Sequence, residues 1–329
     1  MFLRSATSIL SLLAATCTLP VFSQDGSALD SSAAINATTL HHIKTVFVIV
    51  MENHNWTGNG SLNIKGNPAA PYINYTLIPM ASHAENYQNP PNIHPSLPNY
   101  LWLEGGTSFG VTNDGPPSQN HQTTDVHLAK FLENAGISWK AYEENISGTN
   151  CPLVNSGPLD PNGSPLYAVK HDPFVYFDDE TNHRDPNWAP CKAHIRPYTE
   201  LAHDLSANTV ARYNFITPNL CDDMHDSCGG DPIAHGDAWL KANVPAILNS
   251  TAYRSGGALF IVWDEGAVGN GPIPMIVLSP FAKGNGYAGK VYYTHSSMLR
   301  TMQEIFGVYP LIRYASSLPD LQDLFAVFP

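Results

Sequence analysis

The stretch TVFVIVMEN, residues 45–53, decides the fold. Its first six residues form a short, uncharged run rich in β-branched side chains, which predicts a strand buried on both faces. The run ends in Glu52 and Asn53, a carboxylate and an amide. Open α/β sheets bind their ligands at the carboxyl ends of their strands, so these two oxygen ligands stand where a site is expected.

A second run, ALFIVWDEG at residues 258–266, has the same form and ends in Asp264 and Glu265. For either strand alone, the acid could simply begin a loop or cap a helix. Two buried strands that both end in oxygen ligands favour one shared metal site at the edge of the sheet.

The rest of the chain alternates between strand-like and helix-like segments, which predicts an α/β fold with a parallel or mostly parallel sheet. Strands are expected at residues 45–51, 137–142, 212–217, 258–263 and 273–278, and helices at 97–104, 125–135, 197–205, 236–249 and 296–306.

The N-terminus is typical of a secreted protein. Residues 1–23 combine a basic start with an apolar run, which predicts a signal peptide, and residues 24–42 are expected to be a flexible lead-in. Residues 43–329 are then expected to form a single domain without a membrane-spanning segment. Charged residues make up only 13% of the chain, and a high density of glycosylation sequons fits a glycoprotein. The sequons begin at Asn36, Asn55, Asn59, Asn74, Asn145, Asn162 and Asn249.

Four cysteines remain after the signal peptide, and in an oxidising compartment an even number predicts disulfides. Three pairings are possible. We favour Cys221 with Cys228, closing a small loop, and Cys151 with Cys191. The second pair would staple residues 143–195, a Pro-, Asn-, Asp- and Gly-rich insertion expected near the mouth of the site. A zinc site is the rival reading, but the usual two-residue spacing of its cysteines is absent.

The net charge of −12 argues against a basic nucleic-acid-binding surface. It would also repel an anionic substrate, so a phosphate site needs local positive charge. With only 16 Lys and Arg residues, a bound metal is the simplest source of that charge.

Ser96, in the stretch NIHPSLPNYLWLEGG at residues 92–106, precedes an expected helix. A serine there is commonly an N-cap. Alternatively, its hydroxyl stands at a helix N-terminus, where backbone N–H groups favour a phosphoryl oxyanion. A serine needs a base or a metal before it can act as a nucleophile.

The loop PNLCDDMHDSCGGD, residues 218–231, concentrates acids around His225. Carboxylates with imidazole suit zinc, manganese or iron, although a solvated acidic loop has the same composition. His295, in YYTHSS before the last helix, would matter only if it meets the other residues in space.

The ordered set ENH…HPSLPNY…PNLCDDMHD…WDEG…THSS resembles the phosphoesterase family of secreted acid phosphatases and bacterial phospholipases C, within the alkaline-phosphatase-like superfamily. The resemblance covers about residues 43–307 and is stronger to the acid-phosphatase branch, because no further β domain follows. It implies an alkaline-phosphatase-like fold, with a central mostly parallel sheet flanked by helices on both faces.

The resemblance also implies roles for individual residues. Ser96 would be the nucleophile that forms a phosphoserine, with His225 and His295 as further catalytic groups. One or two divalent metal ions would be held by Glu52, Asn53, Asp223, Asp264 and Glu265. Asp222 is an alternative to Asp223. Asn113 and His121 would contact the phosphate.

Three functions are compatible with this pattern. The first is a secreted, metal-dependent acid phosphatase acting on small phosphate monoesters. The second is a phosphodiesterase or phospholipase C using the same site, and the third a glycoprotein that binds a ligand without catalysis. The sequence does not determine the oligomeric state.

Overall fold

The computed structural model describes residues 41–267, 269 and 271–329. The predicted signal peptide at residues 1–23, nearly all of the lead-in at 24–42 and the sequon at Asn36 lie outside the described residues.

A mostly parallel sheet forms the centre of the fold. Within the described residues it has eight strands, in the order β11–β2–β10–β9–β1–β8–β4–β7. Their bounds are β1 Thr45–Met51, β2 Ser82–Ala84, β4 Trp139–Glu143, β7 Ile195–Pro197, β8 Tyr213–Thr217, β9 Gly257–Trp263, β10 Met275–Leu278 and β11 Tyr287–Gly289. Smaller sheets pair β3 Tyr87–Gln88 with β12 Tyr293–Thr294, and β5 Ser156–Leu159 with β6 Pro165–Tyr167.

Each of the five predicted strands is present, and β1, the strand of the opening stretch, lies between β9 and β8. β1 runs parallel to both neighbours, whereas β10 runs antiparallel to β9 and β2. The connection from β9 to β10 is too short for the crossover that a parallel pair requires, which explains the reversal.

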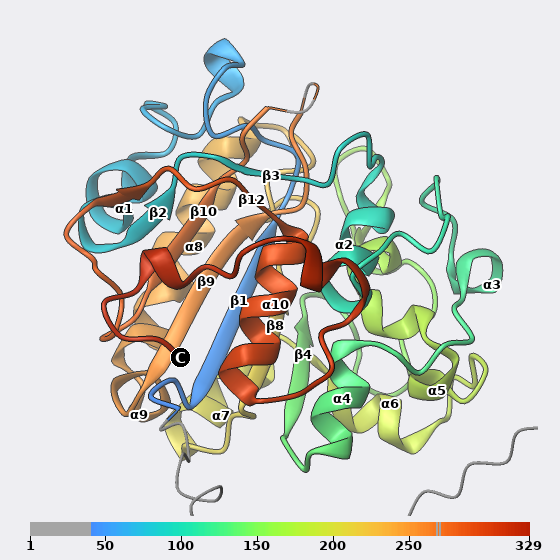
Figure 1. Ribbon diagram of the computed structural model, residues 1–329. Coiled ribbons are helices and arrows are strands. Elements are labelled where there is room, and N and C mark those ends of the chain that lie inside the picture. The colour runs from blue at the N-terminus through green and yellow to red at the C-terminus, as the bar shows by residue number, and fades with distance from the viewer. Residues whose placement is uncertain (1–40, 268, 270) are drawn as a thin grey trace, which may run out of the picture. The chain divides into compact units, whose positions relative to one another are not determined.

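Helices cover both faces of the sheet, as predicted. Figure 1 shows α10 in front of the strands and α8 behind them. α10 contacts α2 and α4, while α8 contacts α7 and α9. The bounds are α1 Ile78–Met80, α2 Ser96–Gly105, α3 Pro117–Asn120, α4 Leu128–Asn134, α5 Asp178–Thr181, α6 Ala189–His194, α7 Thr199–Ala207, α8 Pro232–Asn249, α9 Thr251–Arg254 and α10 His295–Phe306.

The last helix shows how local sequence sets these bounds. Thr294 caps α10 by accepting a hydrogen bond from the backbone of Ser296, and Gly307 ends the helix in the left-handed conformation. Its apolar residues are buried against the sheet. Among the residues that the structure describes, no helix is long and apolar enough to cross a membrane.

The insertion at residues 143–195 is closed by a disulfide between Cys151 and Cys191, and Cys221 pairs with Cys228. This is the pairing that the sequence analysis favours. The insertion holds the small β5–β6 sheet, short 3₁₀ helices and helices α5 and α6. It therefore folds as an ordered excursion from the end of β4.

Two of the predicted sequons do not suit glycosylation, because a glycan needs a free and exposed side-chain amide nitrogen. Asn55 is only 2% exposed. The amide nitrogen of Asn74 donates to the carbonyl oxygens of Ile64 and Ala70, each at 2.9 Å. Asn162 and Asn249 are exposed. The amide nitrogen of Asn162 donates to Asp160 at 3.2 Å, so Asn249 is the better placed acceptor of the two.

The long disulfide should stabilise the fold more than the short one. Its cysteines are 40 residues apart against 7, so loop-closure entropy predicts losses of about 4 and about 2 kcal/mol when each bond is removed. We expect the double variant C151S/C191S to unfold at lower urea concentration than C221S/C228S. Equal losses in the two variants would contradict this ranking.

Glu104, near the end of α2, should make the fold less stable at alkaline pH. Its buried carboxyl accepts a hydrogen bond from the hydroxyl of Tyr213 at 2.6 Å, and burial raises its pKa to about 8. Between its unfolded pKa of about 4.3 and the folded value, the folded state holds a proton that the unfolded chain releases. The stabilisation from this group is therefore complete below the unfolded pKa and is lost as pH rises through the folded pKa, by on the order of 5 kcal/mol in total.

The variant Glu104→Gln should flatten the dependence of unfolding free energy on pH in this range. The control is Glu200→Gln, because Glu200 lies on α7 with a pKa lowered by its hydrogen bond to Arg196. The free energy of unfolding, measured with denaturant at pH 5 and at pH 8, should change less between the two pH values in Glu104→Gln than in Glu200→Gln. Parallel pH curves for Glu104→Gln and the wild type would disprove the assignment.

Candidate active site

Three neighbouring strands deliver acidic side chains to one edge of the sheet. β9, β1 and β8 are adjacent, and Met51 at the end of β1 pairs in register with Trp263 at the end of β9. Glu52 and Asp264 therefore leave the sheet at the same level, and the backbone N–H of Asp264 donates to the carbonyl of Met51 at 3.0 Å. The loop after β8 adds Asp223, whose carbonyl accepts from the backbone N–H of Glu52 at 2.8 Å.

Glu52 is the centre of this cluster and is fully buried. Its Oε2 accepts a hydrogen bond from the hydroxyl of Ser96 at 3.0 Å, and its Oε1 lies 3.0 Å from Nε2 of His171. Ser96 is the first residue of α2, and the N-cap of this helix is Pro95. The hydroxyl is thus turned into the acidic cluster, and the capping role considered for it is not observed.

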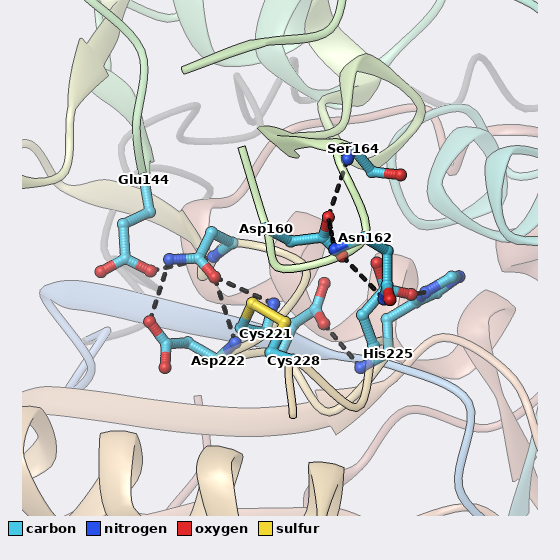
Figure 2. The surroundings of a disulfide bond; sticks show 11 residues. Glu144, Asp160, Asn162, Ser164, Cys221, Asp222, His225 and Cys228 are labelled. Atoms are coloured by element: carbon cyan, nitrogen blue, oxygen red, sulfur yellow. Dashed lines mark hydrogen bonds and ion pairs between the residues drawn. A yellow bond between two sulfur atoms is a disulfide. The ribbon is translucent and has the colours of Figure 1, made fainter. Parts of the chain in front are cut away.

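The structure distinguishes the two acids of the 218–231 loop. Asp223 is fully buried, and its Oδ2 lies 3.2 Å from Nδ1 of His171. Asp222 instead accepts from the side-chain amide of Asn219 at 2.9 Å. Figure 2 shows Asp222 on the Glu144 side of the Cys221–Cys228 disulfide and His225 on the opposite side. Asp223 is therefore the acid that meets Glu52.

The two acids that follow β9, Asp264 and Glu265, make contacts with different parts of the structure. Oδ1 of Asp264 accepts from the backbone N–H of Asn53 at 3.3 Å, so Asp264 stays with the cluster. Oε2 of Glu265 contacts Nδ1 of His94 at 2.6 Å and the amide of Asn99 at 2.9 Å. Glu265 thus ties the end of β9 to α2, rather than facing Glu52 as expected of a metal ligand.

A cation stands beside the acids. Nζ of Lys170, on a side chain that is 17% exposed, donates to Oδ2 of Asp114 at 3.1 Å and to Nε2 of His225 at 3.2 Å. His225 in turn contacts Asp226 through Nδ1 at 2.7 Å. Because an ammonium group only donates, Nε2 of His225 carries its lone pair toward the cluster.

His295 does not take the position expected of a catalytic group. Its Nε2 donates to the carbonyl oxygen of Asp264 at 2.6 Å, and its Nδ1 accepts from the hydroxyl of Tyr87 at 2.9 Å. Both ring nitrogens are occupied by the protein. Burial lowers its pKa to about 4, so the ring is neutral at mildly acidic pH. His295 positions the backbone of Asp264 and is not the cation that the sequence analysis considered.

Asn113 and His121, the expected phosphate ligands, are not brought into contact with the cluster. The side-chain oxygen of Asn113 accepts from the backbone of Gly115 and from Asn120, each at 2.8 Å, within its own loop. His121 contacts Asp178 at 2.9 Å. The residue of this loop that does reach the site is Asp114, which accepts from the backbone N–H of Leu97 at the start of α2.

Burial and mutual repulsion disfavour the charged forms of these acids. Desolvation and the neighbouring carboxylates raise the pKa of Glu52 well above its ordinary value. Desolvation raises the pKa of Asp264 to about 7, and desolvation with repulsion from Asp264 raises that of Glu265 to about 9. The pKa of His171 is lowered, first by burial and then by Lys170. The protein alone therefore supplies too little positive charge for this set of acids.

The unpartnered atoms of the cluster fit a divalent metal ion. Among the buried atoms here, Oδ1 of Asn53 and Oδ2 of Asp264 make no hydrogen bond. Oε1 of Glu52 and Oδ2 of Asp223 make ion-pair contacts with the ring nitrogens of His171, at 3.0 and 3.2 Å, that do not have hydrogen-bond geometry. Glu52, His171 and His225 also bring ligand atoms within 4.8 Å of one another. Each unsatisfied buried group costs about 1–3 kcal/mol, and carboxylate oxygens with imidazole are ligands for zinc, manganese or iron.

Sequence reasoning missed Lys170, His171 and Asp114. The first two lie in the insertion, where no periodic pattern marks buried positions, although the insertion was expected near the site. One signal was available: Lys170, His171 and Asp172 stand together between the apolar residues Val169 and Pro173, an unusual place for three ionisable groups.

Comparison with known proteins identifies phosphatases among the relatives of this chain. Phosphatidylinositol-3-phosphatase of Mycobacterium tuberculosis is 27% identical, over 88% of this chain and 85% of its own. Phosphate-repressible acid phosphatase of Penicillium chrysogenum is also 27% identical, over 67% of this chain and 51% of its own, so this chain spans about half of that relative. A protein in the alkaline phosphatase superfamily from Vibrio parahaemolyticus has the same fold, with a TM-score of 0.53, 11% identity and coverage of 87% of this chain and 73% of that chain.

Residues 85–309, more than half of the chain, match the Phosphoesterase family. The resemblance seen in the ordered motifs is thereby confirmed, and so is the alkaline-phosphatase-like α/β fold. The chain belongs to the phosphoesterase family and is a hydrolase of phosphate esters.

Proposed function

We propose that this protein is a secreted, metal-dependent acid phosphatase that hydrolyses phosphate monoesters through a phosphoserine intermediate. The observation that carries the proposal is the Ser96 hydroxyl, which points from the start of α2 to the buried carboxylate of Glu52 at 3.0 Å. The acid-phosphatase and phosphatidylinositol-3-phosphatase relatives, both named for phosphatase activity, support it.

Ser96 is suited to attack a phosphoryl group. Glu52 accepts its hydroxyl hydrogen bond, and the first turn of α2 directs backbone N–H groups toward a bound anion. One of these groups, the backbone N–H of Leu97, already donates to Asp114 at 3.0 Å, so a bound anion would take the place of this carboxylate or use the neighbouring N–H groups. The serine is 1% exposed, which limits access of bulk water to the reacting oxygen.

Glu52, Asn53, Asp223 and Asp264 would hold the metal, with His171 and His225 beside them. A bound divalent ion would lower the pKa of the Ser96 hydroxyl and neutralise charge on the phosphoryl oxygens. Glu265 and His295 support this set from outside, through α2 and through the backbone of Asp264.

Lys170 and His225 are the groups placed to handle the substrate's charge and protons. Lys170 gives the site a cation that does not depend on metal. Burial and Lys170 lower the pKa of His225, and its Nε2 lone pair accepts from Nζ of Lys170 at 3.2 Å. We assign His225 the proton transfer that accompanies attack of water on the phosphoserine.

Secretion is supported by the predicted signal peptide and by the two disulfides, which form in oxidising compartments. The second candidate, a diesterase or phospholipase C, would use the same nucleophile and differ in its leaving group. Rates on a chromogenic monoester, its diester analogue and phosphatidylcholine separate the two. The proposal requires the monoester to be fastest and the optimum to lie below neutral pH.

Replacing the nucleophile should abolish turnover without unfolding the protein. Ser96→Ala should lower kcat on a chromogenic monoester by on the order of 10³-fold or more, because no other group can form the phosphoserine. The control is Ser206→Ala, since Ser206 is an exposed residue whose hydroxyl bonds the carbonyl of His203. Undiminished turnover by Ser96→Ala would move the nucleophile elsewhere.

Removing the metal should also abolish activity. Chelation of the purified protein should stop monoester hydrolysis, and added divalent metal should restore it. Glu52→Gln should lower both bound metal, measured by elemental analysis, and kcat, because a neutral amide replaces the central carboxylate. Full activity in protein shown to be metal-free would refute metal dependence.

A further inference from the structure

A second group of acids and imidazoles lies away from Ser96. It contains Glu180 on α5, Glu133 on α4 and His194 on α6. Glu104 is close enough for its charge to raise the pKa of Glu180. Since Glu104 is eight residues beyond Ser96 on α2, about 12 Å along the helix axis, this group is distinct from the active site.

Glu180 is held between imidazoles at distances that do not fit hydrogen bonds. Its Oε2 lies 4.0 Å from Nδ1 of His194, and that nitrogen lies 3.5 Å from Oε1 of Glu133. Hydrogen bonds of this kind measure about 2.7–3.2 Å. By contrast, ligand atoms around a tetrahedral ion with bonds of about 2.0–2.1 Å are about 3.3 Å apart. The contacts at 3.5 and 4.0 Å are wider than this spacing, but one ligand atom from each of the three side chains lies within 4.8 Å of the others, which is close enough for a common ion to draw them together.

Two atoms of the group are buried without a hydrogen-bond partner: Nδ1 of His194, and Oε1 of Glu180, which lies 3.9 Å from Nε2 of His127. The side chain of Glu180 is only 3% exposed. Burial, with repulsion from Glu133 and Asp179, raises its pKa to about 9. Lys130 offsets this only in part: its charge lowers the pKa of Glu180, but its ammonium contacts Glu133 at 3.2 Å and Asp179 at 3.8 Å.

His127 is adjacent but does not belong to the ligand set. Its Nδ1 accepts from the backbone N–H of Lys130 at 3.3 Å and caps α4, and its Nε2 contacts Asp179 at 3.1 Å. His194 differs, because burial lowers its pKa and leaves the ring neutral with Nδ1 unbonded. An imidazole nitrogen and carboxylate oxygens are ligands for a zinc-like ion, although Oε1 of Glu133 also accepts from Nε1 of Trp139 at 3.2 Å.

An ion can reach this place from solvent. A cavity of about 240 Å³ opens beside it, lined by Glu133, Trp139, Lys140 and His194 among others. The side chains of His194 and Glu133 are 29% and 28% exposed, so they form the outer side of the group, and Glu180 forms its buried side.

We propose that Glu133, Glu180 and His194 bind a divalent transition-metal ion, with zinc as the probe, at a structural site separate from the catalytic one. α5 and α6 belong to the insertion, whereas α4 belongs to the body of the fold. The ion would therefore fasten the insertion that carries Lys170 and His171. This proposal does not depend on the reaction assigned above.

The test is zinc content and melting temperature of the full-length purified protein after equilibration with zinc and removal of free metal. His194→Gln and Glu180→Gln should each bind about one equivalent less zinc than the wild type, and zinc should raise their melting temperatures by several degrees less. His203→Gln is the matched control, because His203 is 81% exposed on α7. It should behave as the wild type does.

Testing both variants distinguishes metal binding by Glu180 from a purely structural role of its buried carboxyl group. If Glu180 is only a buried neutral acid, Glu180→Gln keeps the same zinc content and is as stable as the wild type or more so. That outcome, or equal zinc content in His194→Gln and His203→Gln, would overturn the proposal. Loss of one equivalent in both variants, with the control unchanged, would establish it.

Discussion

The burial of three carboxylates, on Glu52, Asp223 and Asp264, at one edge of the sheet is the constraint on which the rest of the structure depends. A buried charge without a partner is strongly unfavourable, so the surroundings must supply compensation. The protein gives Ser96 as a donor, Lys170 as a cation and His171 between two of the acids. Most of what lies within reach of the cluster can be understood as a response to this charge.

The fold holds the cluster by register rather than by flexible loops. β1 is paired on both sides, and the ends of β1 and β9 are in line, so Glu52 and Asp264 have little freedom to separate. His295 and Tyr87 secure the backbone of Asp264, and Glu265 joins it to α2. Ser96 is therefore positioned by the same sheet edge that positions the acids.

The sequence predicted those parts of the site that follow regular elements. Glu52 and Asp264 could be found because apolar runs mark buried strands, and Ser96 because a helix start has a recognisable composition. His171 could not be found this way, since the insertion has no periodicity from which burial can be inferred. The orientation of His295 depends on Tyr87 and on a backbone carbonyl, contacts between distant segments that no local pattern encodes. For the same reason Asp222 and Asp223 could be told apart only in three dimensions.

The edge of the sheet and the insertion, which together form this site, differ in how far their lengths can change during evolution. A single-residue insertion in β1 would turn the side chains beyond it to the opposite face, so length changes there disturb the register that aligns Glu52 with Asp264. The insertion is tied at its base by Cys151 and Cys191, and length changes within that tie need not disturb the sheet. Descendants of such a chain can therefore diversify what the site accepts by remodelling the insertion, while the acidic edge stays constant.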